Sequence, residues 1–208
     1  MSQENSQKND RIKTIYIFRH GETDWNKDRR LQGHTDIPLN STGQSQALGV
    51  RDFFLAHPID AMLTSDLKRA RETAEIALGN LNIPLIVEAR LRETNLGDAE
   101  GLTQTEVVHR FGHEIWEGWC SLSPDFHHFR FPNGETKSEL LLRVLTALEE
   151  VFLTTSYQKI GVATHGGVVR RMIHHARPDL PSPKMVGNCV VHEINYDFTN
   201  KTWDLKDV

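Results

Sequence analysis

This chain of 208 residues has few cysteines, no long apolar run and no excess of positive charge. Two cysteines, Cys120 and Cys189, are too few for a disulfide framework. A formal net charge of -4 gives no basic footprint, so we expect no nucleic-acid partner. No apolar run is long enough to cross a membrane, and residues 1–13 lack the apolar core of a secretory signal. We therefore expect a cytoplasmic protein with no membrane partner.

The remaining composition is that of an ordinary globular protein, with enough residues for one large domain. No linker divides the chain. Residues 1–13 are polar and are predicted to form a disordered N-terminal tail. Residues 14–208 are predicted to form a single domain.

Short apolar runs alternate with amphipathic segments along this domain. Strands are predicted at 15–18, 60–64, 84–87 and 159–164, and a last pair at 190–196 and 201–205. The longest predicted helices are 44–56, the segment between Ser65 and Gly79, 136–153 and 168–176. Such alternation is typical of a largely parallel sheet covered on both faces. The predicted fold class is α/β, a three-layer α/β/α sandwich with a mostly parallel central sheet and an antiparallel edge.

Boundary residues give further predictions. Ser41 or Thr42 is expected to cap the first helix, and Ser65 or Asp66 the second. Residues 24–41 are predicted to form a polar loop. Residues 105–119 are predicted to be helical in pieces, interrupted by Gly112 and Gly118.

Chemically similar side chains follow three of the predicted strands. Arg19 and His20 end the first strand, Arg69 lies within one helical turn of the second, and His165 follows the fourth. A loop near the third strand supplies Glu93. Because the carboxyl ends of parallel strands meet at one edge of a sheet, we expect these side chains to lie together.

Two histidines, two arginines and a carboxylate favour chemistry over binding alone. Arginine forks and helix starts hold phosphate, although they would hold a carboxylate ligand equally well. An imidazole can attack phosphorus and carry the phosphoryl group. A carboxylate can protonate the leaving oxygen and then deprotonate the attacking water. The set therefore indicates phosphoryl transfer.

At this point the sequence resembles the histidine phosphatase superfamily, the phosphoglycerate-mutase-like group. The segments that carry the resemblance occur in order over almost the whole chain: RHGETDWN, LQGHTDIPLN, TSDLKRARETA, LRETNLGDAEG, PNGET and VATHGGVVR. PNGET is similar to the motif before the long helix in the smaller phosphatases. The resemblance implies a phosphoglycerate-mutase-like fold.

The resemblance also implies the roles of individual residues. His20 is expected to be the nucleophile that forms a phosphohistidine, and Glu93 the acid, with Arg19, Arg69 and His165 as the other catalytic residues. The expected substrate-binding residues are Arg19, Asn26, Gln32, Gly33, Arg69, His165 and Gly166. The family uses no metal, and neither a metal nor another cofactor is expected here.

The resemblance leaves three functions open. The first is a phosphomonoester hydrolase acting on a small phosphorylated metabolite; the others are a cofactor-dependent phosphoglycerate mutase and a non-catalytic scaffold that binds phosphorylated ligands. Thr94 after Glu93, where mutases usually have arginine, and the short segment from Gly101 to Asn133 favour a hydrolase. PNGET and the compact length favour the small-molecule phosphatases, of which the α-ribazole type is one. Ala99, where many relatives have an aromatic residue, is expected to leave extra room.

Residues 113–135 fit two interpretations equally, a substrate cap or an apolar patch that closes the core. The oligomeric state stays open.

Overall fold

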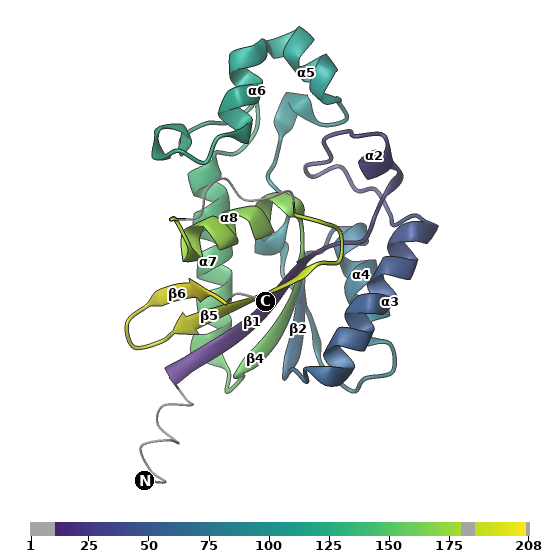
Figure 1. Ribbon diagram of the computed structural model, residues 1–208, viewed down its shortest axis with the longest axis vertical. Helices are drawn as coiled ribbons and strands as arrows, with labels where there is room; N and C mark the ends of the chain where they lie inside the picture. The colour runs from purple at the N-terminus through teal and green to yellow at the C-terminus, as the bar shows by residue number, and fades with distance from the viewer. Residues whose placement is uncertain (1–10, 180–185, 207–208) are drawn as a thin grey trace.

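The computed structural model describes residues 11–179 and 186–206, and a six-stranded sheet lies at its centre (Figure 1). The strands are β1 (Ile12–Arg19), β2 (Ala61–Thr64), β3 (Leu85–Val87), β4 (Lys159–Thr164), β5 (Val191–Asp197) and β6 (Thr202–Leu205). Their order is β3-β2-β4-β1-β5-β6. The first four strands are parallel, whereas β5 pairs antiparallel with β1 and β6 with β5. The predicted parallel sheet with an antiparallel edge is confirmed.

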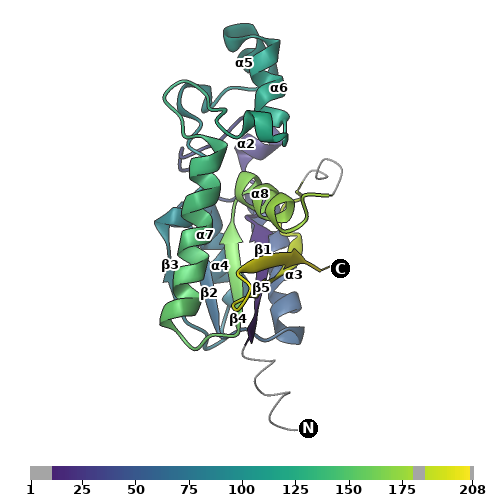
Figure 2. The same cartoon turned by 90° about the vertical axis from the view of Figure 1, so that its left-hand side faces the viewer.

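Helices lie on both faces of this sheet. The α-helices of the described residues are α2 (Asp24–Lys27), α3 (Ser41–Ala56), α4 (Lys68–Leu78), α5 (Gln104–Phe111), α6 (His113–Cys120), α7 (Lys137–Thr154) and α8 (Gly166–Ala176), and short 3-10 turns are η1 (Ala89–Leu91), η2 (Gly97–Ala99) and η3 (Pro124–Phe126). Helices α3 and α4 cover one face, and α7 and α8 the other (Figures 1 and 2). The α/β three-layer prediction is therefore confirmed.

Alternation along β1 explains why both faces are covered. Ile15 and Ile17 pack in the core cluster of α7 and α8, whereas Tyr16 and Phe18 pack in the cluster of α3 and α4. Successive side chains of a strand point to opposite faces, so a continuous apolar run requires a cover on each. The strand begins at Ile12, within the expected tail of 1–13, and residues 1–10 of that tail lie outside the described residues.

Two predicted helix caps are wrong. The cap of α3 is Asn40, whose Oδ1 accepts a hydrogen bond from the Gly43 amide at 2.9 Å. Helix α4 has no side-chain cap of its own, and its Lys68 amide donates to Asp36 Oδ1 at 2.7 Å. Asp66 instead binds Arg92. An aspartate from a distant loop thus replaces the local cap.

Local pattern also misses details of two loops. The 24–41 segment contains the short helix α2, which the side chains of Thr23 and Asn26 cap reciprocally. Gly112 separates α5 from α6 with a φ of 94°, as predicted. Gly118 lies inside α6 and is not a break.

Helices α5 and α6 stand above the carboxyl ends of the parallel strands, near α2 (Figure 1). Trp119 and Phe129 pack on Phe131, with ring centroids 5.5 and 5.4 Å apart, and Trp116 joins the same apolar cluster. The packing favours the core-closing interpretation for these aromatic residues. Ala99 is fully buried in the cluster, so its small side chain leaves no exposed opening beside the Glu93 loop.

Each helix among residues 11–179 and 186–206 is too short or too polar to cross a lipid bilayer.

Candidate active site

Five predicted catalytic side chains meet at the carboxyl edge of the parallel strands. Arg19 ends β1, His20 follows it, and His165 follows β4. Arg69 lies in the first turn of α4, and Glu93 lies just after η1. The rings of His20 and His165 lie edge to face with centroids 5.3 Å apart. We refer to these five residues as the catalytic cluster.

His20 is held as a neutral imidazole. Its Nδ1 lies 2.7 Å from the Gly21 carbonyl, which can only accept, so Nδ1 carries the proton and Nε2 keeps a lone pair. Burial, together with the charges of Arg69 and Arg19, lowers the pKa of His20 well below its ordinary value. The ring is therefore uncharged at neutral pH, with its single proton on Nδ1.

Gly21 permits the segment after His20 to approach the start of α3 closely. A Cβ at this position would collide with the carbonyl of Gly43, at the start of α3. The Gly21 amide donates to Thr73 Oγ1 at 3.0 Å, and that hydroxyl donates to the Arg69 carbonyl at 2.6 Å. The turn after β1 is thus tied directly to α4.

Arg69 is fully buried, and two protein carbonyls orient its guanidinium. Nη1 donates to the Thr35 carbonyl at 2.8 Å, and Nη2 donates to the Gly33 carbonyl at 2.7 Å. Burial lowers the pKa of Arg69 to about 10, against the attraction of Glu93, so the side chain stays protonated at neutral pH. Its Nε is buried and has no hydrogen-bond partner among the described residues.

Arg19 and His165 also hold unsatisfied nitrogen atoms inside the cluster. Within the described residues, Arg19 Nε and both ring nitrogens of His165 are buried without a partner. Arg19 Nη1 donates to the Val186 carbonyl at 3.0 Å. Burial and then the charge of Arg69 lower the pKa of His165 well below its ordinary value. Buried polar atoms without partners are rare in native proteins, and here they indicate room for a polar ligand.

Glu93 is fixed by backbone amides on both carboxylate oxygens. Oε1 accepts from the Thr94 amide at 2.8 Å, and Oε2 accepts from the Gly167 amide at 2.9 Å. A Cβ on Gly167 would collide with the Glu93 carboxylate, so glycine is required for this contact. The neighbouring Gly166 lies against Arg19, since a Cβ there would be 3.4 Å from Nε.

The structure places the other expected binding residues around the same cluster. Gln32 is buried, and its Oε1 has no partner among the described residues. Gly33 reaches Arg69 through its carbonyl. Asn26 is one step further away: its Oδ1 accepts from Thr23, and Asn188 Nδ2 lies 2.8 Å from the His20 carbonyl and 3.5 Å from Asn26 Oδ1.

Sequence patterns missed a clasp that holds the Glu93 loop. Arg143 on α7 donates to the carbonyls of Arg90, Arg92 and Glu93 at 2.6, 2.8 and 2.8 Å, and it pairs with Glu135 at 2.5 Å. The PNGET segment contains Glu135 and was the one available signal. Asn188, close to His20, had no signal in the sequence.

A second missed group is Glu100, which holds the loop carrying Gly33. Its carboxylate accepts from the amides of His34 and Thr35 at 2.8 and 2.9 Å. His34 donates from Nε2 to the Glu93 carbonyl at 2.9 Å. The loop that carries Gly33 and the loop that carries Glu93 are therefore bound to each other.

No group of three or more His, Cys, Asp or Glu residues in the described chain is arranged to hold a metal ion.

Comparison with known proteins gives a family match over residues 15–207, to the histidine phosphatase superfamily, branch 1. The "uncharacterized phosphatase PhoE" of Bacillus subtilis is 33% identical over 196 residues, which cover 93% of this chain and 92% of that protein. A "probable phosphoglycerate mutase GpmB" of Photorhabdus laumondii is 37% identical over 197 residues, covering 89% and 86%.

Among solved structures, a putative α-ribazole-5'-P phosphatase of Escherichia coli is similar, with a TM-score of 0.76 and 26% identity over 94% of this chain and 95% of that one. These findings confirm the predicted family and the predicted enzyme class, a phosphatase. The chain belongs to the histidine phosphatase superfamily.

Proposed function

We propose that the chain hydrolyses a small phosphomonoester through a phosphohistidine on His20. One observation carries the proposal: four buried nitrogen atoms, in Arg19, Arg69 and His165, lack partners beside a neutral His20. Two of these side chains are permanent cations at neutral pH, which suits a dianionic phosphoryl group. The same charges would stabilise its oxygens during transfer.

In the first step, the lone pair of His20 Nε2 attacks phosphorus, and the bond from phosphorus to the ester oxygen breaks. Protonated Glu93 gives its proton to that oxygen, so the alcohol leaves neutral. Arg19 and Arg69 balance the charge of the phosphoryl oxygens, and His165 donates to one of them when protonated. The Gly166 amide and Asn26 complete this site in the proposal.

In the second step, water attacks phosphohistidine and gives its proton to the Glu93 carboxylate. The phosphorus–nitrogen bond breaks, His20 regains its lone pair, and inorganic phosphate leaves. The amides of Thr94 and Gly167 hold Glu93 in place for both proton transfers. In this scheme Gln32 and Gly33 border the substrate.

Hydrolysis is favoured over mutase activity because nearby arginines form ion pairs within the protein. A mutase must hold a second acidic group, yet Arg30, Arg90 and Arg92 each pair with a carboxylate of the protein. The proposed substrate is therefore a small metabolite with a single phosphate.

Trapping of the intermediate tests the covalent step. Wild type is exposed briefly to a 32P-labelled phosphomonoester, quenched in alkali and digested, and the labelled peptide is identified by mass spectrometry. We expect acid-labile, alkali-stable phosphate on His20, and none in His20→Ala. The same treatment of His165→Ala shows whether the label depends on the second histidine. Label that persists in His20→Ala would contradict the mechanism.

Turnover separates the proposal from its alternatives. A panel of phosphorylated metabolites is assayed for phosphate release, with and without a bisphosphate primer. We expect release that needs no primer and disappears in His20→Ala. Activity that requires the primer would support a mutase, and absence of turnover by wild type would support a scaffold.

A further inference from the structure

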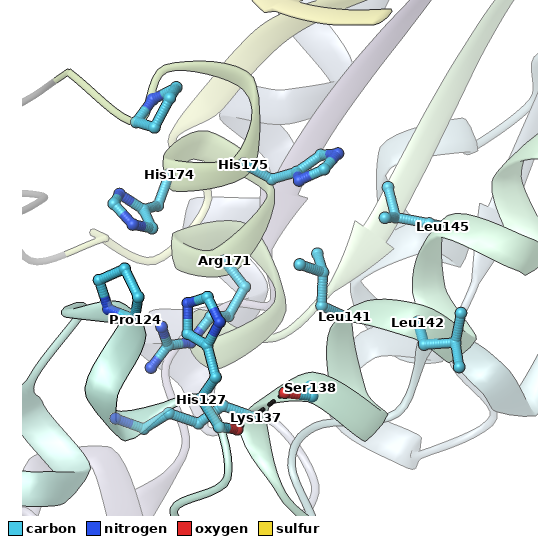
Figure 3. A pocket seen from close by; sticks show the side chains of 11 residues that line it. Pro124, His127, Lys137, Ser138, Leu141, Leu142, Leu145, Arg171, His174 and His175 are labelled. Atoms are coloured by element: carbon cyan, nitrogen blue, oxygen red, sulfur yellow. Dashed lines mark hydrogen bonds between the residues drawn. The ribbon is translucent and has the colours of Figure 1, made fainter. Parts of the chain in front are cut away.

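A cavity of about 460 Å³ lies between α7, α8 and the segment that contains η3 (Figure 3). The volume falls in the range of roughly 300–1,000 Å³ that is usual for small-molecule sites. Its residues come from parts of the chain that are far apart in sequence, from Pro124 to Pro178. None of them belongs to the catalytic cluster.

One side of the cavity is apolar. Leu141, Leu142 and Leu145 of α7 form it, and Figure 3 shows them together opposite the basic groups. Leu142 is 68% exposed, so an aliphatic side chain stands at the cavity without a protein partner to cover it. An apolar ligand body would remove this surface from water.

The other side is basic. Lys137, Arg171 and His127 lie together beside Pro124 in Figure 3, and His174 of α8 continues this side. The ring of His175 extends from the other side of α8, toward Leu145. Every ionisable group among the described lining residues is basic, and none is a carboxylate. The charged side of the cavity therefore has no acidic lining residue, and Glu149, outside the lining, interacts electrostatically with His175.

Burial makes the positive charges of Lys137 and Arg171 energetically unfavourable, because they lose the solvation of water. Lys137 is 3% and Arg171 8% exposed. Burial, and then the charge of Arg171, lowers the pKa of Lys137 to about 7. Lys137 Nζ donates to the carbonyls of Gly118 and Ser121 at 2.5 and 2.6 Å and lies over the rings of Phe126 and Phe129. His174 Nδ1 is buried without a partner among the described residues.

The cavity is formed before any ligand arrives. Ser138 donates to the His127 carbonyl from its amide at 3.1 Å and from Oγ at 2.9 Å, which fixes the η3 segment to α7. Lys137 ties the end of α6 to the same helix start. A preformed cavity has no ordering cost to meet on binding.

The cavity is separate from the catalytic cluster. His165 precedes α8, whereas Arg171 lies six residues further along the chain and His175 ten. At about 1.5 Å per residue, these side chains begin roughly 9 Å along the helix from the catalytic end. A phosphate held by the cluster does not fill this space.

We propose that the cavity binds a second small molecule, an amphipathic organic anion whose acidic head lies against Arg171 and Lys137 and whose apolar body lies against the leucines of α7. A carboxylate on an aliphatic chain has this chemistry. A ligand without charge leaves the buried cations unpaired, and a small inorganic anion leaves the leucines exposed.

Fluorescence of 8-anilinonaphthalene-1-sulfonate reports binding, and competition identifies the chemistry. We expect one probe per chain, displaced by decanoate but not by decanol at equal concentration. Saturating orthovanadate, which occupies the catalytic cluster, is expected to leave the probe bound. Equal competition by decanol, or displacement by orthovanadate, would overturn the proposal.

Two leucines on α7 provide a matched pair of variants. Leu142 lines the cavity and Leu153 does not, and each is 68% exposed. We expect Leu142→Glu to raise the probe Kd at least fivefold, because it puts a charged carboxylate against the apolar body of the probe, and Leu153→Glu to change it less than twofold. Arg171→Gln, checked for folding by circular dichroism, is expected to raise the Kd at least fivefold. Equal Kd values for the two leucine variants would place the probe elsewhere and contradict the site.

Discussion

His20 is prepared for the proposed attack by its own neighbours. The bond from Nδ1 to the Gly21 carbonyl leaves Nε2 with a free lone pair. Burial, together with the charges of Arg69 and Arg19, keeps the ring uncharged. A separate general base is therefore unnecessary for this nucleophile. The same two arginines that favour the neutral ring would bind the phosphoryl group, so one arrangement serves both needs.

Glu93→Gln tests the proton transfers assigned to that carboxylate. Alkyl phosphates need a proton on the leaving oxygen, so we expect kcat for them to fall about 10²–10⁴-fold. The nitrophenolate of p-nitrophenyl phosphate leaves without a proton, but water still needs a base. Stopped-flow absorbance should therefore show a burst of one nitrophenolate per enzyme followed by slow turnover.

An equal loss for alkyl and nitrophenyl substrates, with no burst, would contradict this role of Glu93. Thr94→Ser serves as the control, because the amide that binds Glu93 belongs to the backbone and is retained. Its activity is expected to stay within about twofold of wild type, since it changes neither the carboxylate nor the proton it carries.

At the scale of elements, α7 positions the acid loop from outside the catalytic cluster. Arg143 reaches three successive stretches of that loop, and Glu135 accepts from the Asn95 amide at 2.8 Å while pairing with Arg143. A planar guanidinium can serve these diverging acceptors at once, whereas an ammonium cannot. The long helix is therefore part of the geometry of Glu93.

Arg143→Lys is expected to reduce kcat for alkyl phosphates about 10- to 100-fold with little change in KM, because it loosens the loop but leaves the phosphate ligands intact. The rate of the nitrophenolate burst with p-nitrophenyl phosphate should fall less than kcat for alkyl phosphates, as expected for Glu93→Gln, because this leaving group needs no proton. Loss of these partly buried, charged hydrogen bonds should also lower the free energy of unfolding by about 1–3 kcal/mol, measured in urea.

The control for this clasp is Arg71→Lys on α4, in an exposed pair with Glu75 at 2.8 Å. An exposed pair contributes little, so its free energy of unfolding should change by less than about 0.5 kcal/mol, and its activity should not change. An Arg143→Lys enzyme that loses stability but keeps wild-type kcat would make Arg143 structural only.

Strands and helices were predictable because their apolar periodicity is local. The run from Ile15 to Phe18 predicts a buried strand, and the structure confirms it. The cap of α4 was not predictable, because the acceptor for Lys68 is Asp36, which lies 32 residues away. Arg143 was missed for the same reason: its backbone partners Arg90 and Arg92 are 53 and 51 residues distant.

At the scale of the whole molecule, the sheet topology brings together side chains that are far apart in the sequence. The order of the parallel strands brings the ends of β1, β2 and β4 side by side, so the meeting of Arg19, Arg69 and His165 could be expected from sequence. The second cavity could not be expected, because it depends on how α7, α8 and η3 pack. The spacing of its basic residues along the sequence does not match a binding motif.

His20 and His165 also affect the stability of the entire fold. His20 and His165 are buried and have strongly lowered pKa values in the folded chain, whereas in the unfolded chain they titrate near about 6.5. As pH falls through that value, the unfolded chain takes up protons that the folded chain does not. The free energy of unfolding should therefore decrease, by up to about 1.4 kcal/mol per pH unit for each histidine, and these two groups should add no pH dependence above about pH 7.5.

Urea unfolding of wild type and His20→Gln between pH 5 and 8 measures this contribution. Other histidines with a lowered pKa, such as the half-buried His192, contribute to the wild-type slope, so the difference between the two proteins isolates His20. In His20→Gln, we expect the free energy of unfolding to fall less steeply with decreasing pH, by up to about 1.4 kcal/mol per pH unit. The control His128→Gln changes an exposed side chain and should keep the wild-type slope. Bound phosphate offsets Arg69 and Arg19 and favours protonated histidine, so saturating phosphate should flatten the limb in wild type. Identical slopes in wild type and His20→Gln would show that His20 takes up its proton over the same pH range in the folded and unfolded chains, which would contradict a lowered pKa.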